Sequence, residues 1–463
     1  MVAFPLQTQK GRSVNLIRDW LGRVINKQSL PCSWADQRRN EALELLAHVG
    51  NERTWTDLSR HSNGFVREVA VRELCSHPSP DALIALIERL NDWVPQVRNL
   101  AASGLQYYLT PSQAQALLAA LEPLMNLAAC RRVDHGSTLT AARVVLQSPS
   151  IRDEVYKSFL ARQGKAARYL FALLLEVESA PETLLCSALA HRELTVRLMA
   201  ITACGTLPVA QAQPLLLEAL SRRGVSVRVR ALHALLPLLD DPRQVVREAL
   251  LDESPSIRHL AHWAASRNEI DALNVLTERL NQELPVMKRD WLGVLGLAGD
   301  LNVGIVQEWH TGALRSAYSS VRHAAVKLLR DDQLPEMFEA LDDPSEKIFV
   351  AALDQLNKQP WARVKDRLDT KLNKNWHGLS LPRRAALFQV RPRWQQLAYL
   401  LERLEAEPDA PAYWLRQVDL WCDRQYQIVD PVTPKAERDA LVNRLRELAA
   451  RGLIRSESLA RVA

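Results

Sequence analysis

Two histidines have the spacing best suited to metal chemistry. His259 and His262 are three residues apart, so on a helix both imidazoles would face the same side and could share a metal ion. No obvious cysteine or acidic partner accompanies them in the neighbouring sequence. We therefore expect solvent-facing or groove histidines, and we predict neither a metal site nor a cofactor.

The sequence also lacks the common catalytic motifs. It contains no G-x-G-x-x-G loop, no Walker loop, no H-E-x-x-H pair and no G-x-S-x-G elbow. Gly293, Gly296 and Gly299 have the wrong spacing for a dinucleotide fingerprint and indicate a closely packed helix end. We predict no catalytic residue and a protein that is not an enzyme.

A basic, tryptophan-containing segment spans residues 361–396. It holds nine lysines and arginines against two aspartates, a net charge of +7, whereas the whole chain carries +6. Its cations could neutralise phosphates while tryptophan stacks on bases. Equally, the segment could bind an acidic protein, or form a solvated face above core tryptophans. The candidate binding residues are Arg363, Lys371, Lys374, Trp376, Arg383, Arg384, Arg391, Arg393 and Trp394.

An internal repeat defines the elements that must position these residues. The stretches 194–207 and 225–238 carry matching Val-Arg, alanine and leucine positions 31 residues apart. Their apolar positions are spaced i, i+4, i+7 and i+11, which is one stripe of an α-helix. Further Val-Arg or Ile-Arg copies begin at Val66, Val97, Ile257 and Val321, and weaker copies lie near Arg131, Ala167-Arg168 and Ile348.

Each repeat contains another helical pattern ahead of the motif helix. A leucine-rich stretch such as 80–90, 212–220 or 269–280 precedes the motif helix, and a short polar turn joins the two. One unit is therefore a hairpin of two helices, about 31 residues long. A single hairpin cannot cover its own apolar face, so neighbouring hairpins must stack. The sequence predicts an all-α protein.

The repeated pattern of a leucine-rich helix, an Asp-containing turn and Val-Arg-x-x-Ala resembles HEAT repeats of the type called PBS-lyase HEAT-like. The resemblance covers residues 54–358 and implies a right-handed superhelical α-solenoid of about ten hairpins. Residues 1–53, which include an amphipathic pattern at 15–25, would then form an N-terminal helical cap. Residues 359–463 would form a helical C-terminal region containing the basic segment 361–396.

The same resemblance implies an Asp–Arg ladder between repeats. The arginines that match the motif are Arg67, Arg98, Arg197, Arg228, Arg258 and Arg322, and Asp92 and Asp252 match the turn acid. The copy at Ile348 has Asp342 and Asp343 in its turn, but Phe349 stands where the arginine is expected, which is typical of an end cap.

Positions one and five residues after the motif arginine should project from the concave face of such a stack. In the later repeats they are aromatic and basic, and the candidate binding residues are His233, His259, Trp263, His323 and Lys327. A partly exposed tryptophan is a common anchor of protein interfaces. We predict a scaffold or adaptor that binds a protein partner along its concave face, and an acidic protein is one candidate. The alternative is nucleic-acid binding, through the basic segment or through a cleft like that of HEAT-type DNA glycosylases.

Composition gives the expected location. The chain has 463 residues, of which 47% are hydrophobic and only 16 are glycine, a combination that suits helices. Its six cysteines form no C-x-x-C pair, as expected in a reducing cytosol. No run approaches the roughly 18 apolar residues of a membrane span, and the N-terminus has no signal-peptide pattern. We expect a cytoplasmic protein that does not bind membranes.

Overall fold

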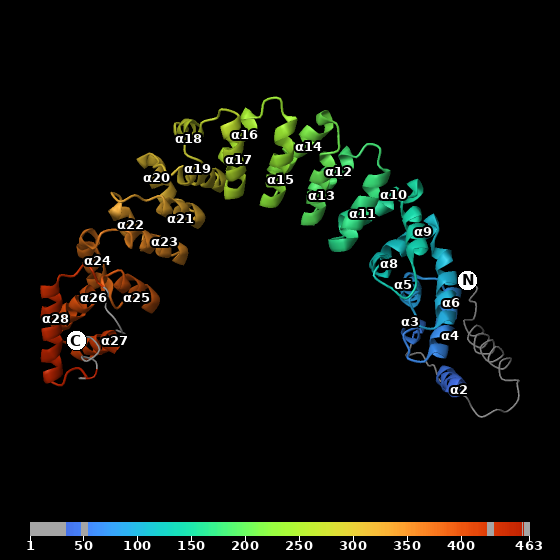
Figure 1. Ribbon diagram of the computed structural model, residues 1–463, viewed down its shortest axis with the longest axis horizontal. Helices are drawn as coiled ribbons and strands as arrows, with labels where there is room; N and C mark the ends of the chain where they lie inside the picture. Colours follow the sequence, from blue (N-terminus) through green and yellow to red (C-terminus); the bar gives the residue numbers. More distant parts are fainter. Residues whose placement is uncertain (1–33, 48–53, 424–429, 456, 458–463) are drawn as a thin grey trace, which may run out of the picture. The chain divides into compact units, whose positions relative to one another are not determined.

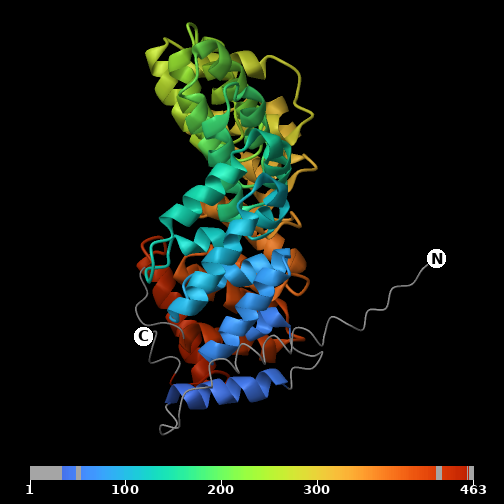
Figure 2. The same ribbon diagram turned by 90° about the vertical axis from the view of Figure 1, so that its right-hand side faces the viewer.

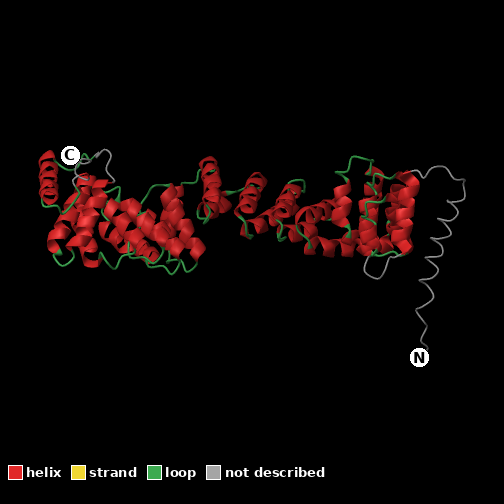
Figure 3. Ribbon diagram, turned by 90° about the horizontal axis from the view of Figure 1, so that it is seen from below, coloured by secondary structure: helices red, strands yellow, loops and turns green. Residues whose placement is uncertain are grey.

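The computed structural model describes residues 34–47, 54–423, 430–455 and 457. These residues form helices and loops without a strand, which confirms the all-α prediction (Figure 3). They divide into two compact units, residues 1–239 and 240–463. The amphipathic pattern at 15–25 lies outside the described residues.

The helices of the first unit follow one another with short connections. They are α2 (Trp34–Ala47), α3 (Trp55–Leu58), α4 (Gly64–Ser76), α5 (Pro80–Arg89), α6 (Pro95–Leu105), α7 (Ala114–Ala119), α8 (Leu121–Leu127), α9 (Gly136–Leu146), α10 (Arg152–Ala161), α11 (Gly164–Val177), α12 (Glu182–Leu189), α13 (Leu194–Cys204), α14 (Val209–Ser221) and α15 (Val225–Leu235). Helix α2 packs against α4, and Figure 2 shows it in blue at the N-terminal end of this unit.

The second unit continues the same alternation. Its helices are α16 (Arg243–Leu250), α17 (Pro255–Arg267), α18 (Ala272–Leu280), α19 (Lys288–Asp300), α20 (Gln307–Leu314), α21 (Ser319–Lys327), α22 (Leu334–Ala340), α23 (Glu346–Leu356), α24 (Trp361–Asn375), α25 (Leu381–Gln389), α26 (Arg393–Ala406), α27 (Pro411–Asp423) and α28 (Lys435–Ala450).

Within each unit the helices form pairs, and the pairs are arranged in two layers. Helix α12 packs against α13, and α14 against α15; α12 also contacts α14, and α13 contacts α15. The second unit repeats this pattern in the pairs α16/α17, α18/α19, α20/α21 and α22/α23 (Figure 1). We call α4, α6, α13, α15, α17, α19, α21 and α23 the second helices, because each follows its partner in the chain.

The repeat motif occupies one register on the second helices. Its apolar residue is the third residue of α4, α6, α13, α15, α17, α21 and α23, and it is at most 2% exposed in every case. The alanine four positions later is fully buried in all seven helices. A methyl group at that position allows the neighbouring second helix to approach closely, since the separation of packed helices is set by the side chains at their contact.

Two of the weaker sequence copies differ from the expected register. Arg131 is not helical but lies in the loop between α8 and α9. Helix α11 begins at Gly164, so its third residue is Ala166, one position before the expected Ala167. The extra helix α9 packs against α7 and α8 and lengthens the spacing between the strong copies.

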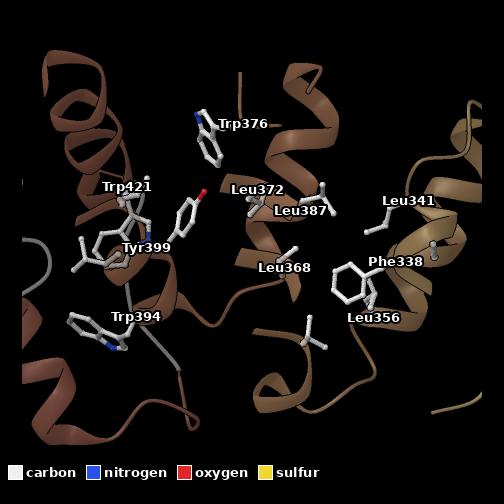
Figure 4. Packing of buried hydrophobic residues seen from close by; sticks show 14 of the residues in the cluster. Phe338, Leu341, Leu356, Leu368, Leu372, Trp376, Leu387, Trp394, Tyr399 and Trp421 are labelled. Atoms are coloured by element: carbon white, nitrogen blue, oxygen red, sulfur yellow. The ribbon is translucent and has the colours of Figure 1, made fainter. Parts of the chain in front are cut away.

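The C-terminal helices share a core with the preceding pairs. One apolar cluster runs from Val326 in α21 to Ile454 after α28 (Figure 4). It includes Leu356 of α23, Leu368 of α24 and Trp421 of α27, all at most 5% exposed. The expected boundary after Lys358 therefore falls inside the second unit, where the core is continuous.

The arginine of the motif holds its own turn together. The guanidinium of Arg67 donates through Nη1 to the carbonyl oxygens of His61 and Ser62, at 2.8 and 3.0 Å. Arg258 and Arg322 contact the carbonyls six and five residues before them in the same way. Arg98 reaches the carbonyl of Asp92, six residues before it, at 2.7 Å. These bonds satisfy carbonyl groups that a tight turn leaves without backbone partners.

The same arginines also reach carboxylates in the following pair. Arg67 forms a bidentate ion pair with Asp92, and both distances are 2.8 Å. Arg322 pairs in the same way with Asp343, at 2.7 and 3.1 Å. At these two arginines the contacts are the ones expected of an Asp–Arg ladder.

Motif arginines that lie between these two in the chain have other partners. Arg258 pairs with Asp300 at the end of α19, while Asp252 pairs with Arg289. Arg197 donates to the carbonyl of Arg223 instead of a carboxylate. That turn carries arginines at 222 and 223, so it offers no acid to Arg197.

Turn acids also accept a hydrogen bond from the backbone of the residue just before the helix that follows them. Oδ1 of Asp92 accepts the N–H of Val94 at 2.9 Å, and Asp343 accepts that of Ser345 at 2.8 Å. In two turns a histidine takes this place: Nδ1 of His191 accepts the N–H of Glu193 at 3.0 Å, and His61 does the same for Asn63. From the sequence only acids were expected at this place in the turn, so the two histidines that make the same hydrogen bond were missed.

Two glycines of α19 confirm the expected close packing. A methyl group on Gly293 would lie 1.9 Å from the carbonyl oxygen of Leu251, and one on Gly296 would lie 2.4 Å from the guanidinium of Arg258. A methyl group on Gly299 would meet only Leu328, at an ordinary 3.5 Å. The space beside Gly293 and Gly296 is therefore filled by the neighbouring pair.

We expect Gly293→Ala to destabilise the protein by about 2 kcal/mol or more, because the backbone of Leu251 must move to accept the added carbon. Gly299→Ala, on the same helix, is the matched control and should be neutral or stabilising by up to about 1 kcal/mol, since alanine favours helix. Urea denaturation followed by far-ultraviolet circular dichroism measures both. Equal effects of the two substitutions would contradict the close packing at Gly293.

The Arg67–Asp92 pair predicts a pH-dependent stability. Burial raises the pKa of the Asp92 carboxyl, but hydrogen bonds from Arg67 and the Val94 N–H, with the positive charges of Arg67 and Arg89, outweigh it and leave the pKa below its usual range. This carboxyl therefore stabilises the fold at neutral pH, and the contribution is lost as the pH falls through its folded pKa.

Asp92→Asn should cost about 3–5 kcal/mol at neutral pH, because Arg67 stays buried without its counter-charge. The difference from the wild-type protein should begin to shrink below about pH 4, the pKa of an aspartate in the unfolded chain, and should vanish below the lower pKa of the folded carboxyl. Urea denaturation at both pH values measures this, with the exposed Asp81→Asn in the same unit as control. A cost that does not change with pH would rule out the ion pair as its source.

Candidate interaction surfaces

The five residues predicted to line a concave face lie on second helices. His233 is on α15, His259 and Trp263 are on α17, and His323 and Lys327 are on α21. All are exposed except His323, which is half-buried. His233 belongs to the first unit and the other four to the second. The structure thus places four of these residues in two pairs, one on α17 and one on α21, with one turn of helix between the members of each pair, and His233 lies apart from them.

Trp263 is the largest exposed side chain of this set. It is 49% exposed, although Ala261, Ala264 and Ala265 beside it in the helix are buried. The guanidinium of Arg267, one turn later, lies 3.8 Å from the centre of the indole ring and donates to the Trp263 carbonyl at 3.3 Å. One face of the exposed indole ring is therefore in contact with the Arg267 guanidinium. Sequence reasoning missed Arg267, although its i+4 spacing from Trp263 could have indicated it.

The two histidines with metal-ligand spacing have different surroundings. His259 is exposed, whereas His262 is half-buried with Nε2 4.0 Å from Oδ2 of Asp300. That carboxylate is already paired with Arg258, whose Nε lies 2.6 Å away. Among the described residues, no three histidine, cysteine or acidic side chains are grouped so that they could hold a metal ion.

His323 presents a neutral ring at physiological pH. Burial lowers its pKa, and the charges of Lys327 and Lys347 lower it further. Its imidazole can therefore donate one hydrogen bond and accept another, while the positive charge on this part of α21 comes from Lys327.

Two of the three tryptophans of the basic segment are core residues. Trp376 and Trp394 are 5% and 6% exposed, and both belong to the apolar cluster of the second unit (Figure 4). Trp376 donates through Nε1 to the hydroxyl of Tyr413 at 2.9 Å, and Trp394 packs against Trp421. Because their ring faces are covered, neither can stack on a nucleobase, contrary to the expectation that they could contact a partner.

Four of the predicted cations hold neighbouring helices together. Lys371 pairs with Asp342 at 2.7 Å, and the buried Arg391 pairs with Asp369. Arg384 donates to the Trp376 carbonyl at 3.2 Å and lies over its ring. The fourth is Arg383, which pairs with Glu346 at 3.1 Å. The structure assigns these side chains to packing contacts.

Arg383 also explains the arginine missing at Phe349. Its Nη2 donates to the carbonyl of Asp343, six residues before Phe349, at 3.0 Å. Its guanidinium lies 4.6 Å from the centre of the Phe349 ring. An arginine from α25 thus makes the turn contact that the motif arginine makes elsewhere. The sequence gives no local signal for this, because the two residues are far apart in the chain.

The remaining predicted cations are exposed. Arg363 and Lys374 lie on α24, and Arg393 is the first residue of α26. Arg367 on α24 is also exposed and was not singled out as a site residue, although its i+4 spacing from Arg363 places it on the same face. The exposed charge of the segment is therefore concentrated on one helix.

A search of the described residues for membrane-spanning helices and comparisons with known proteins both found nothing. None of the helices within the described ranges is long and apolar enough to cross a membrane. No protein-family model matches this chain, and no curated protein matches it in sequence.

Proposed function

We propose that this chain is a HEAT-like α-solenoid, a right-handed superhelix of about ten hairpins, that acts as a non-enzymatic scaffold. The shared register of the motif supports this proposal. In seven second helices the third residue and the alanine four positions later are buried, as expected if each pair is packed between its neighbours. The arginine contacts with successive turns fit the ladder of that family.

The proposed ligand is a protein partner bound along the exposed faces of the second helices. Within each unit such a surface suits a protein because its helices are packed in register, and a rigid surface loses little conformational entropy on binding. The paired turns hold successive helices in fixed register, as Arg67 and Asp92 do between α4 and the turn after α5.

Trp263 is the observation that carries the proposal. A tryptophan that is nearly half exposed leaves a large apolar area in water, and burying such an area in an interface is favourable. Arg267 holds the ring in place, so little side-chain entropy remains to be lost. Tryptophan and arginine are also the residue types most enriched at energetic centres of interfaces.

Nucleic-acid binding through the basic segment has weaker support. Proteins that bind single strands combine cations with exposed aromatic rings, and the rings of Trp376 and Trp394 are buried. The cations of Lys371, Arg383 and Arg391 are already paired with carboxylates. Binding of a protein along the second helices requires neither these tryptophan rings nor these cations.

We expect Trp263→Ala to weaken partner binding at least about tenfold, the loss typical of removing an interface anchor, without loss of folding. His233→Ala should also weaken binding if its helix takes part in the same interface. The measurement is affinity purification of the full chain from its native host, with nuclease treatment, followed by quantitative mass spectrometry.

Trp34→Ala is the matched control, since Trp34 is 68% exposed and also lies near an arginine of its own helix, Arg38. Proteins retained by the wild type and by Trp34→Ala but lost with Trp263→Ala would support the proposal. Wild-type retention by Trp263→Ala and His233→Ala would exclude these helix faces as the binding surface. Loss of all captured proteins on nuclease treatment would favour nucleic acid.

A further inference from the structure

Helix α24 carries a row of cations on its outermost face. Arg363, Arg367, Thr370 and Lys374 are spaced i, i+4, i+7 and i+11, and all four are exposed. We call this row the basic ridge. Its ends are eleven residues apart, which on an α-helix is about 16 Å.

The core fixes the direction in which the basic ridge points. Val364, Leu368 and Leu372 of the same helix are at most 1% exposed and belong to the apolar cluster of the second unit. On a helical wheel these residues lie opposite the basic ridge, because each turn advances by 3.6 residues. The ridge therefore faces solvent.

The flanks of α24 are held by ion pairs to its neighbours. Lys371 pairs with Asp342, which precedes α23, and Asp369 pairs with Arg391, which precedes α26. These contacts come from opposite sides of the ridge and keep the helix from rolling. The backbone that carries the ridge cations is thus held in place, while their side chains are exposed to solvent.

The positive charge of the basic ridge is not neutralised within the described residues. Arg363, Arg367 and Lys374 form no ion pair there, and the nearest acid on the exposed side of the helix is Asp366. Of the other cations of the segment, Lys371, Arg383 and Arg391 pair with carboxylates, whereas Lys365 and Arg393 are exposed. What remains is a linear positive surface on a rigid helix.

We infer that the basic ridge binds an acidic polypeptide segment. This is a second surface, separate from the second helices that carry the proposed scaffold function. An acidic helix repeats its carboxylates with the same period of 3.6 residues, so glutamates at i, i+4 and i+11 face all three cations at once. The hydroxyl of Thr370 donates to the Asp366 carbonyl, so a small neutral side chain separates the two arginines from Lys374.

Other anionic partners fit the ridge less well. Duplex DNA is usually held by about 6–10 phosphate contacts, whereas the ridge offers three cations. Single strands need stacking rings, and the ridge exposes none among its four residues. Peripheral membrane helices place apolar side chains beside their cations, but the apolar residues of α24 named above are buried in the core.

The test uses the full chain and labelled poly-L-glutamate as the acidic probe, titrated by fluorescence anisotropy at about 0.1 M salt, where the screening length is about 10 Å. The triple variant R363E/R367E/K374E should bind at least about tenfold more weakly, because three exposed attractions become repulsions. Its circular dichroism should match that of the wild type, since all three side chains lie outside the core.

The matched control is K288E/R416E/K435E, which makes the same change in charge at three scattered, exposed positions of the same unit. It should bind within about twofold of the wild type, because charges farther away than about 10 Å are screened. Equal weakening in both triple variants, or no binding by the wild type, would overturn the inference.

Duplex DNA and vesicles containing phosphatidylserine are tested in the same way. Tighter binding of either probe that is lost in R363E/R367E/K374E would reassign the ridge to that partner and overturn the acidic polypeptide. The result is independent of Trp263→Ala, because the probe is synthetic and the two surfaces are changed separately. Either proposal can therefore fail alone.

Discussion

The close approach of neighbouring second helices is the constraint on which the described fold depends. At that contact the chain places a fully buried alanine on each of the seven motif helices. A larger side chain there would push the pairs apart and expose the valine or isoleucine that lies one turn earlier. Packing is also close at Gly293 of α19, where even one methyl group would collide with the carbonyl of Leu251 in the turn after α16. The exposed residues have defined positions because this packing leaves little freedom beneath them.

The turns add a second constraint, which acts through charge. Three motif arginines, Arg67, Arg258 and Arg322, have two tasks: each satisfies carbonyls of its own turn and reaches a carboxylate farther along the chain. A buried ion pair gains little over an apolar contact but is costly to break. Such pairs therefore fix the register between neighbouring hairpins more than they add to total stability. Arg363, Arg367 and Lys374 take no part in this system and are exposed.

The repeat register could be predicted from the sequence because it depends on local periodicity. Val196 and Ala200 lie one helical turn apart, and both are buried as the spacing indicates. Which side chains of the basic segment are buried, paired or exposed could not be predicted from such periodicity. Lys371 and Lys374 look alike in the sequence, but one faces Asp342 of a neighbouring pair and the other faces solvent. Only tertiary packing distinguishes them, and the same holds for the burial of Trp376 and Trp394.

The contact of Arg383 with the turn before α23 has a consequence for how the chain can be divided. Repeat proteins are often treated as modular, so that a truncation placed between two repeats leaves complete units on either side. A chain that stopped after α23 would keep Phe349 but lose the guanidinium that covers it, and the carbonyl of Asp343 would lose its donor. The pair α22/α23 is complete only with α25, and the smallest self-sufficient fragment at this end must extend beyond the last recognisable copy of the motif.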